Sequence, residues 1–356
     1  MKRLALLLLT LLPLCSFAQD GTKETSDPKG SKDPKELYKP VIGGTVRAKY
    51  EWQTEISKGR FQVRTARVSV TGKVLPNVDY KAEVDLSDKG EIRMLDAYTD
   101  ISFLRDWTFK IGQMRVPFSI DAHRSPYSQY FPNRSFLAKE VGDVRDVGAT
   151  LTYSIPAAFP IKLEAGIFNG SGITNQDDFW TNVVNFSSKA QFFFPKGFNL
   201  TLSAQKIEPD EIPIWMYDAG IYWEKGPWHL EAEYLYKHYK GNAFHDVNTF
   251  NLFGFYDIRL RNSVFHTLSL LARYDYMDAH SHGIRYNSAG IADPEGILIA
   301  NDAKRSRLTA GLTLFFDKDK LKSAIRLNYE KYFYPEGITP KVSERDKIVL
   351  EIMTHF

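Results

Sequence analysis

Four arginines occur within residues 114–145, and three of them have few acidic neighbours. Only Asp121 is acidic in the stretch that runs from Arg115 through Arg124 to Arg134. A guanidinium group is permanently charged, and its forked donors match two oxygens of an oxyanion such as phosphate. Fixed positive charge in a constriction where water screens poorly favours anions. We therefore predict that Arg115, Arg124 and Arg134 select anions, with solvated loop arginines as the open alternative.

The fourth arginine, Arg145, has a different setting. Asp143 and Asp146 flank it in the sequence, and paired charges more often fix local structure than bind ligands. We therefore predict that Arg145 and Asp146 anchor the end of this stretch. Further basic residues are secondary candidates, because mixed charges occur on any wall that faces water: Arg47, Lys49, Arg64, Arg67 and Lys110.

Metal-binding and catalytic patterns are weak in this sequence. Asp278, His280 and His282 have a strand-like spacing of two, which could place a carboxylate and two imidazoles on one side. No fourth ligand is specified, so we predict no metal site and no cofactor. No nucleophile elbow or phosphate-cradling glycine loop is present in the sequence. We predict that the protein is not an enzyme, and a barrel hydrolase remains the less favoured alternative.

The elements that position these residues are predicted to be β-strands. The last ten residues alternate, with Ile348, Leu350, Ile352 and Phe356 on one face and Lys347, Glu351 and His355 on the other. Similar segments recur from residue 41 onward, at lengths of about 9–11 residues that suit a tilted strand crossing a bilayer. We count sixteen. Because lipid cannot satisfy free backbone groups, membrane-spanning strands must close into a barrel.

The connections between these strands alternate in length. Short joins such as 104–106 and 225–227 alternate with longer ones, of which 114–145, 169–181 and 278–303 are the longest, while 87–90 is an exception. Such parity is typical of outer-membrane barrels with both termini in the periplasm. The stretch 114–145 is too apolar and aromatic to lie free in water. We predict that it folds inward as a constriction loop in a water-filled barrel spanning residues 41–356.

The amino terminus predicts export. Lys2 and Arg3 precede an apolar run, and small residues end at Ala18, so we predict a signal peptide at 1–18. The polar residues 19–40 are predicted to form a disordered periplasmic leader. Cleavage removes Cys15, the only cysteine, unless it is lipidated instead. It also removes two cations and no acid, so the net charge falls from +3 to +1, which argues against nucleic acid as a partner.

Three ordered motifs resemble those of a known family. Residues 112–118 read Gly-Gln-Met-Arg-Val-Pro-Phe, residues 133–135 read Asn-Arg-Ser, and residues 145–148 read Arg-Asp-Val-Gly. These motifs resemble the landmarks of the phosphate-selective porin O and P family. Met114, Asn133 and Val144 depart from the more usual residues at their positions. The resemblance implies a homotrimeric channel whose inward loop and basic lumen residues favour anions.

We therefore expect an all-β protein, a sixteen-stranded antiparallel barrel in the outer membrane of a Gram-negative bacterium, surrounded by its lipid. Its expected function is passive diffusion of small anions, phosphate or polyphosphate among them. A general porin without selectivity is the main alternative. A structural or adhesive barrel is a further alternative.

Overall fold

The structure is a computed structural model that describes residues 37–356 except 89, 143–144, 171, 174–178, 210–211, 262–263, 294 and 319. The predicted signal peptide, residues 19–36 of the predicted leader, and Asp143 lie outside this part of the chain. No helix among the described residues is long and apolar enough to cross a membrane.

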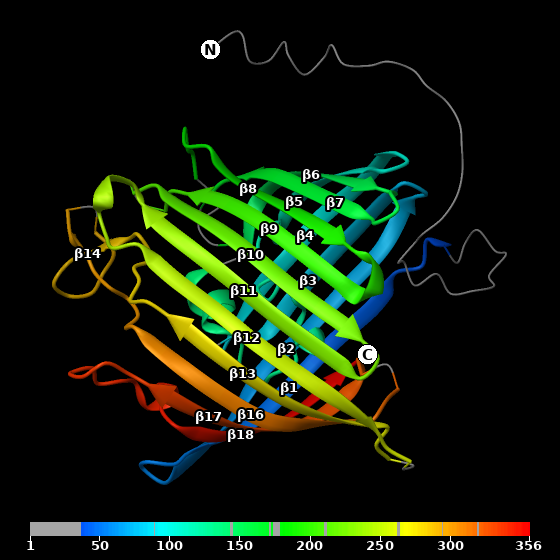
Figure 1. Cartoon of the computed structure of the whole chain (residues 1–356). Helices are drawn as coiled ribbons and strands as arrows, with labels where there is room; N and C mark the ends of the chain where they lie inside the picture. Colours follow the sequence, from blue (N-terminus) through cyan, green and yellow to red (C-terminus); the bar gives the residue numbers. More distant parts are fainter. Residues whose placement is uncertain are drawn as a thin grey trace. The chain divides into compact units, whose positions relative to one another are not determined.

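The described residues form a closed antiparallel barrel of sixteen strands, which confirms the predicted fold class and strand number (Figure 1). Each strand pairs with its neighbours in the sequence, and β1 closes the ring by pairing with β18. The strands are β1 (Val41–Gln53), β2 (Lys58–Leu75), β3 (Val78–Asp88), β4 (Glu91–Leu104), β5 (Trp107–Arg115), β6 (Arg145–Ile155), β7 (Ile161–Phe168), β8 (Asn185–Phe193), β9 (Phe198–Ile207), β10 (Ile214–Lys225), β11 (Trp228–Tyr239), β12 (Val247–Arg259), β13 (Thr267–Met277), β16 (Arg305–Phe315), β17 (Ser323–Phe333) and β18 (Lys347–His355).

The two faces of the wall have opposite chemistry. In β18, Ile348 and Ile352 are exposed at 41% and 53%, whereas Lys347 and Glu351 are buried. A water-soluble sheet would show the reverse, because its apolar side chains would be covered. Apolar side chains outside and polar ones inside are what a barrel in lipid requires.

Connections at one end of the barrel are short, and most of those at the other end are long. At the short-turn end, β10 and β11 are separated only by residues 226–227. At the long-connection end, residues 278–304 join β13 to β16 and contain the small hairpin of β14 (Arg285–Tyr286) and β15 (Ile297–Leu298). The exception predicted at 87–90 is also seen, because β3 and β4 are joined through residues 89–90.

The connection between β5 and β6 carries the predicted arginines. We call its described part, residues 116–142, the β5–β6 segment; it contains the turns η1 (Pro126–Ser128) and η2 (Leu137–Val141). Phe118 and Leu137 are buried in a cluster with Met216, Leu235 and other residues of β10–β13. Phe131 packs in a second cluster with β12 and β13 residues, and Tyr127 packs against Phe315 in a third. The segment therefore lies against side chains on the inward face of the wall.

Candidate functional site

The beginning of the β5–β6 segment is bound to one buried carboxylate of β11. Glu233 accepts hydrogen bonds from the Ser119 hydroxyl at 2.6 Å and from the backbone N–H groups of Ile120 and Asp121. Ser119 has a φ of 63°, a left-handed conformation that turns successive N–H groups toward one point. The backbone is thus shaped to bind this carboxylate, and Glu233 holds the segment to β11.

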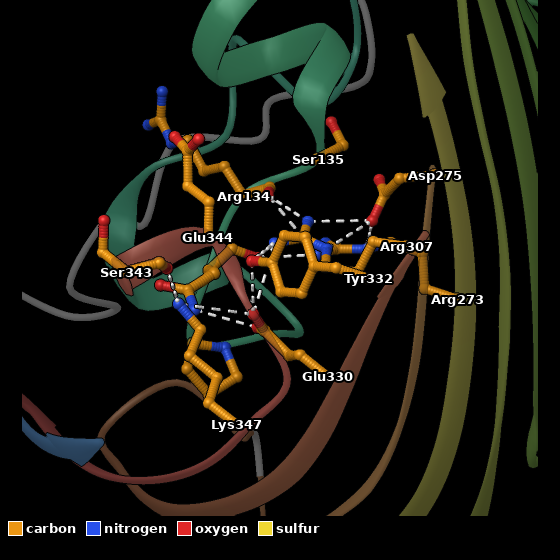
Figure 2. A network of polar contacts seen from close by, with 12 residues as sticks. Arg134, Ser135, Arg273, Asp275, Arg307, Glu330, Tyr332, Ser343, Glu344 and Lys347 are labelled. Carbon is orange, nitrogen blue, oxygen red and sulfur yellow. Dashed lines mark hydrogen bonds and ion pairs between the residues drawn. The ribbon is translucent and has the colours of Figure 1, made fainter. Parts of the chain in front are cut away.

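Three arginines of the wall hold the middle of the segment. Arg47 of β1, Arg273 of β13 and Arg307 of β16 donate to the carbonyl oxygens of Pro132, Asn133 and Arg134, at 2.8, 3.0 and 2.7 Å respectively. Figure 2 shows Arg273 and Arg307 beside Asp275, with Arg307 also reaching Glu330. Arg47 is paired with Glu351. Each wall arginine therefore has a carboxylate partner, and its other donors position the segment.

Arg124, one of the three predicted anion-selecting residues, is also paired. It forms ion pairs with Asp121 at 3.1 Å and with the fully buried Glu231. Its guanidinium lies 4.9 Å from the centre of the Tyr130 ring. Its part in anion selection stays a prediction, but these contacts favour an anchoring role.

Asp121 is the acidic centre of the segment. Its carboxylate accepts from the backbone N–H and the hydroxyl of Ser135, which ties two parts of the segment together. Burial by itself would raise the pKa of Asp121, but Arg124, Arg273 and the Ser135 hydroxyl hold it below its usual value. Asp121 is therefore ionised at neutral pH.

Arg115 and Arg134 differ from Arg124 because neither has a carboxylate partner among the described residues. The Arg115 side chain donates to the carbonyl of His123, and the Arg134 side chain donates to the carbonyl of Arg124 at 3.2 Å. A carbonyl oxygen orients a guanidinium without cancelling its charge. Both predicted residues thus keep their positive charge available.

Arg64, a secondary candidate, also lacks a carboxylate ion pair among the described residues, like Arg115 and Arg134. Its electrostatic neighbours are the cations Arg47 and Arg67 and the carboxylates to which these two arginines are paired, Glu351 and Asp85. Arg134 in turn interacts with Arg64, Arg67 and Arg145. Burial lowers the pKa of Arg134 to about 10, Asp121 opposes this shift, and the three like charges add to it. We call Arg64, Arg115 and Arg134 the unpaired arginines.

The remaining candidates on β1–β6 have carboxylate partners or, for Asp146, backbone donors. Arg67 pairs with Glu83 and Asp85, Lys49 with Glu51, and Lys110 with Asp100. The described ion pairs of Arg145 are with Asp96 and Glu83, on β4 and β3. Asp146 accepts from the backbone of Val147 and Gly170 and so connects β6 to the connection that follows β7.

A histidine lies close to these cations. His123 lies in the segment, one residue before Arg124. Burial, followed by the cations Lys189 and Arg115, holds the pKa of His123 well below its usual value. His123 is therefore neutral at pH 7 and adds no positive charge of its own.

A cavity of about 210 Å³ lies on the long-connection side of the segment. Eight cationic and three acidic side chains line it, among them Lys347 and Glu344, which Figure 2 shows with Arg134. The cations are Lys49, Arg60, Arg64, Arg134, Lys139, Arg305, Arg307 and Lys347, and the acids are Glu51, Glu140 and Glu344. An anion entering from this side meets a net positive surface that includes two unpaired arginines.

The residues of the weak metal motif do not converge. His280 Nε2 lies 3.2 Å from Asp302, whereas Asp278 accepts from Tyr276 and Asn248. In the part of the chain that the structure describes, no three His, Cys, Asp or Glu side chains gather in a way that could hold a metal ion.

Sequence reasoning missed the acids and arginines that hold the segment. Glu231 and Glu233 of β11, Arg305, which pairs with Glu140 of the segment, and Arg307 are not among the residues predicted from the sequence. Their inward positions in β11 and β16 could have shown that they face the lumen. Nothing local could have shown which of them meets the segment.

The comparisons with known proteins agree with this architecture. The model of the family described as phosphate-selective porin O and P matches residues 45–191, which include all three motifs of the predicted resemblance and confirm it over that range. No curated protein matches the chain. Both the family match and the porin fold indicate the outer membrane.

Solved structures similar to this chain are outer-membrane channels and proteins. An anion-selective porin from Comamonas acidovorans is 11% identical with a TM-score of 0.60, over 89% of this chain and 99% of that one. The outer membrane channel DcaP of Acinetobacter baumannii is 13% identical with a TM-score of 0.59, over 90% and 98%. OmpT of Vibrio cholerae, in a trimer form, is 13% identical with a TM-score of 0.59, over 89% and 99%.

Proposed function

We propose that this protein is a passive channel for small anions, with phosphate and related oxyanions as the preferred class. The observation that carries the proposal is the contrast in charge pairing: Arg64, Arg115 and Arg134 lack carboxylate partners, while the other candidate cations of the wall have them. The family match and the likeness to an anion-selective porin support it.

The proposed mechanism follows from the position of the segment. The β5–β6 segment narrows the lumen, and the unpaired arginines present forked donors there. They replace part of the hydration of a passing oxyanion, weakly enough for release. No catalytic step is involved. We further propose a homotrimer, as the resemblance implies and as the trimer form of OmpT supports.

The test is single-channel recording of the purified protein in planar bilayers. In a potassium chloride gradient the reversal potential should show anion preference, and phosphate should compete with chloride. The triple variant R64Q/R115Q/R134Q should conduct but lose most of this preference. The matched control is the triple variant K206Q/K304Q/K331Q, which removes the same number of positive charges. These lysines lie at the long-connection end and pair with Glu208, Asp278 and Asp346. This variant should keep the anion preference.

Two results would contradict the proposal. Cation preference in the unaltered protein would contradict the proposed anion channel. Anion preference that survives in R64Q/R115Q/R134Q would show that the unpaired arginines do not select anions. A channel that conducts without preference would favour a general porin. Absence of any conductance would exclude both channel functions and leave the structural or hydrolytic alternatives.

A further inference from the structure

A second cavity, of about 260 Å³, lies on the other side of the β5–β6 segment. Tyr127 and Tyr130 of the segment form one side, and Phe255, Thr313 and Arg326 of the wall form the other. Its rim includes Lys320, which lies in the turn between β16 and β17 at the short-turn end. We call this cavity the short-turn recess. Its chemistry differs from that of the basic cavity on the long-connection side.

Four aromatic rings are among the side chains that line the short-turn recess. The Tyr130 and Phe255 rings lie 4.9 Å apart between centres and are inclined at 43°. Tyr127 is stacked on His355 at 3.9 Å, which fixes the orientation of its ring. Phe315 also lines the recess. These ring faces suit a ligand with a flat, apolar C–H face.

Two polar atoms in the lining have no hydrogen-bond partner among the described residues. They are the Thr313 hydroxyl oxygen and the Arg326 Nε, both on residues that are 1% exposed. Buried polar atoms in native proteins are normally satisfied. A ligand hydroxyl can accept from Arg326 Nε and can exchange a hydrogen bond with Thr313. Glu224, at the rim, can accept from a further hydroxyl.

We propose that the short-turn recess binds the ring of a monosaccharide. A pyranose has both an apolar face and several hydroxyl groups at its edge, whereas inorganic phosphate has no apolar face and a plain aromatic ring has no edge hydroxyls. Together with the anion channel proposed above, on which this step rests, the recess makes sugars that carry a phosphate or carboxylate group a preferred substrate class. The unpaired arginines select the charged group, and the recess binds the ring.

The test measures block of the chloride current in planar bilayers, with glucose 6-phosphate, glucose or inorganic phosphate added to either chamber. Glucose 6-phosphate should block at a lower concentration than phosphate from the short-turn side. Thr313→Val should raise its half-blocking concentration about three- to tenfold, as loss of one hydrogen bond implies. Phe255→Leu should act in the same direction while keeping an apolar side chain.

Thr309→Val is the matched control. Thr309 lies on the same strand, its hydroxyl is equally buried and unpartnered, and it does not line the recess. Equal effects of Thr309→Val and Thr313→Val would overturn the proposal that the short-turn recess binds a sugar ring. Equal block by phosphate and glucose 6-phosphate would also overturn it. If the channel lacks anion preference but Thr313→Val still weakens block by glucose, sugar binding in the recess is supported and the proposed anion selectivity is wrong.

Discussion

Two groups of arginines in this barrel differ in their partners. One group holds the β5–β6 segment in place, and the other is proposed to select anions. Arg47, Arg273 and Arg307 lie on the wall that holds the β5–β6 segment, and each combines a carboxylate pair with a bond to a backbone carbonyl of the segment. Arg64, Arg115 and Arg134 have no such carboxylate. The same side chain therefore serves as a fixed support in one group and as an available charge in the other.

The largest effect is expected from Arg307→Met. This change removes one of the two cations that pair with each of the buried carboxylates, Asp275 and Glu330, and frees the carbonyl of Arg134. Asp275 keeps Arg273 and Glu330 keeps Lys347, so we expect a loss of about 3 kcal/mol, the lower end of the range for removing one partner of a buried ion pair. The free energy of unfolding in detergent, from urea titration, measures this. Arg60→Met is the control, because its side chain is 53% exposed and should cost no more than about 1 kcal/mol.

Arg124 and Arg134 lie in the same segment but should respond differently to replacement by glutamine. Arg124→Gln removes one of the two partners of buried Glu231, leaving His229, and should lower the free energy of unfolding by about 2 kcal/mol. Arg134→Gln should change stability by no more than about 0.5 kcal/mol but should reduce anion preference. Urea titration and reversal potentials measure the two effects. If Arg124→Gln alone abolished selectivity without loss of stability, the two groups would have been divided wrongly.

A smaller effect should appear on acidification, through Asp121. Its folded-state pKa lies below the ordinary value of about 4, so its contribution to stability is present above pH 4 and is lost as the pH falls toward the lowered pKa. The attachment of the segment should therefore weaken below about pH 4. Fluctuations of the single-channel current should increase there. In Asp121→Asn the change between pH 5 and pH 3 should be smaller than in the unaltered protein.

The smallest expected effect is that of Arg64→Lys. The positive charge stays, so the preference for anions over cations should not change. Lysine lacks the forked geometry that matches two oxygens, so preference for phosphate over chloride should fall by about twofold. Competition of phosphate with the chloride current measures it. An unchanged phosphate preference would show that charge alone, without guanidinium geometry, accounts for the role of Arg64.

The fold could be predicted in detail because its signals are local. Alternation in segments such as 347–356 places one side chain in lipid and the next in water, and each strand carries this pattern by itself. The alternation of short and long connections further indicated that successive strands join at opposite ends of the barrel. Arg115 and Arg134 could be proposed for the same reason, since the lack of nearby acids is visible in the sequence.

The partners of the charged residues could not be predicted in this way. Arg124 seemed unpaired because only Asp121 is close in sequence, yet Glu231, 107 positions away, neutralises it. Arg47 meets Glu351 across 304 positions because β1 and β18 close the barrel. Arg145 pairs with Asp96 for a similar reason, since neighbouring strands bring distant positions together.

The sequence by itself determined a sixteen-strand pattern and a long arginine-bearing connection, because side-chain polarity along the chain suffices for these. Only the tertiary structure decided which arginines keep their charge available, because an ion pair depends on distance in space. It also decided that the β5–β6 segment has a basic cavity on one side and an aromatic recess on the other, since each is assembled from several strands.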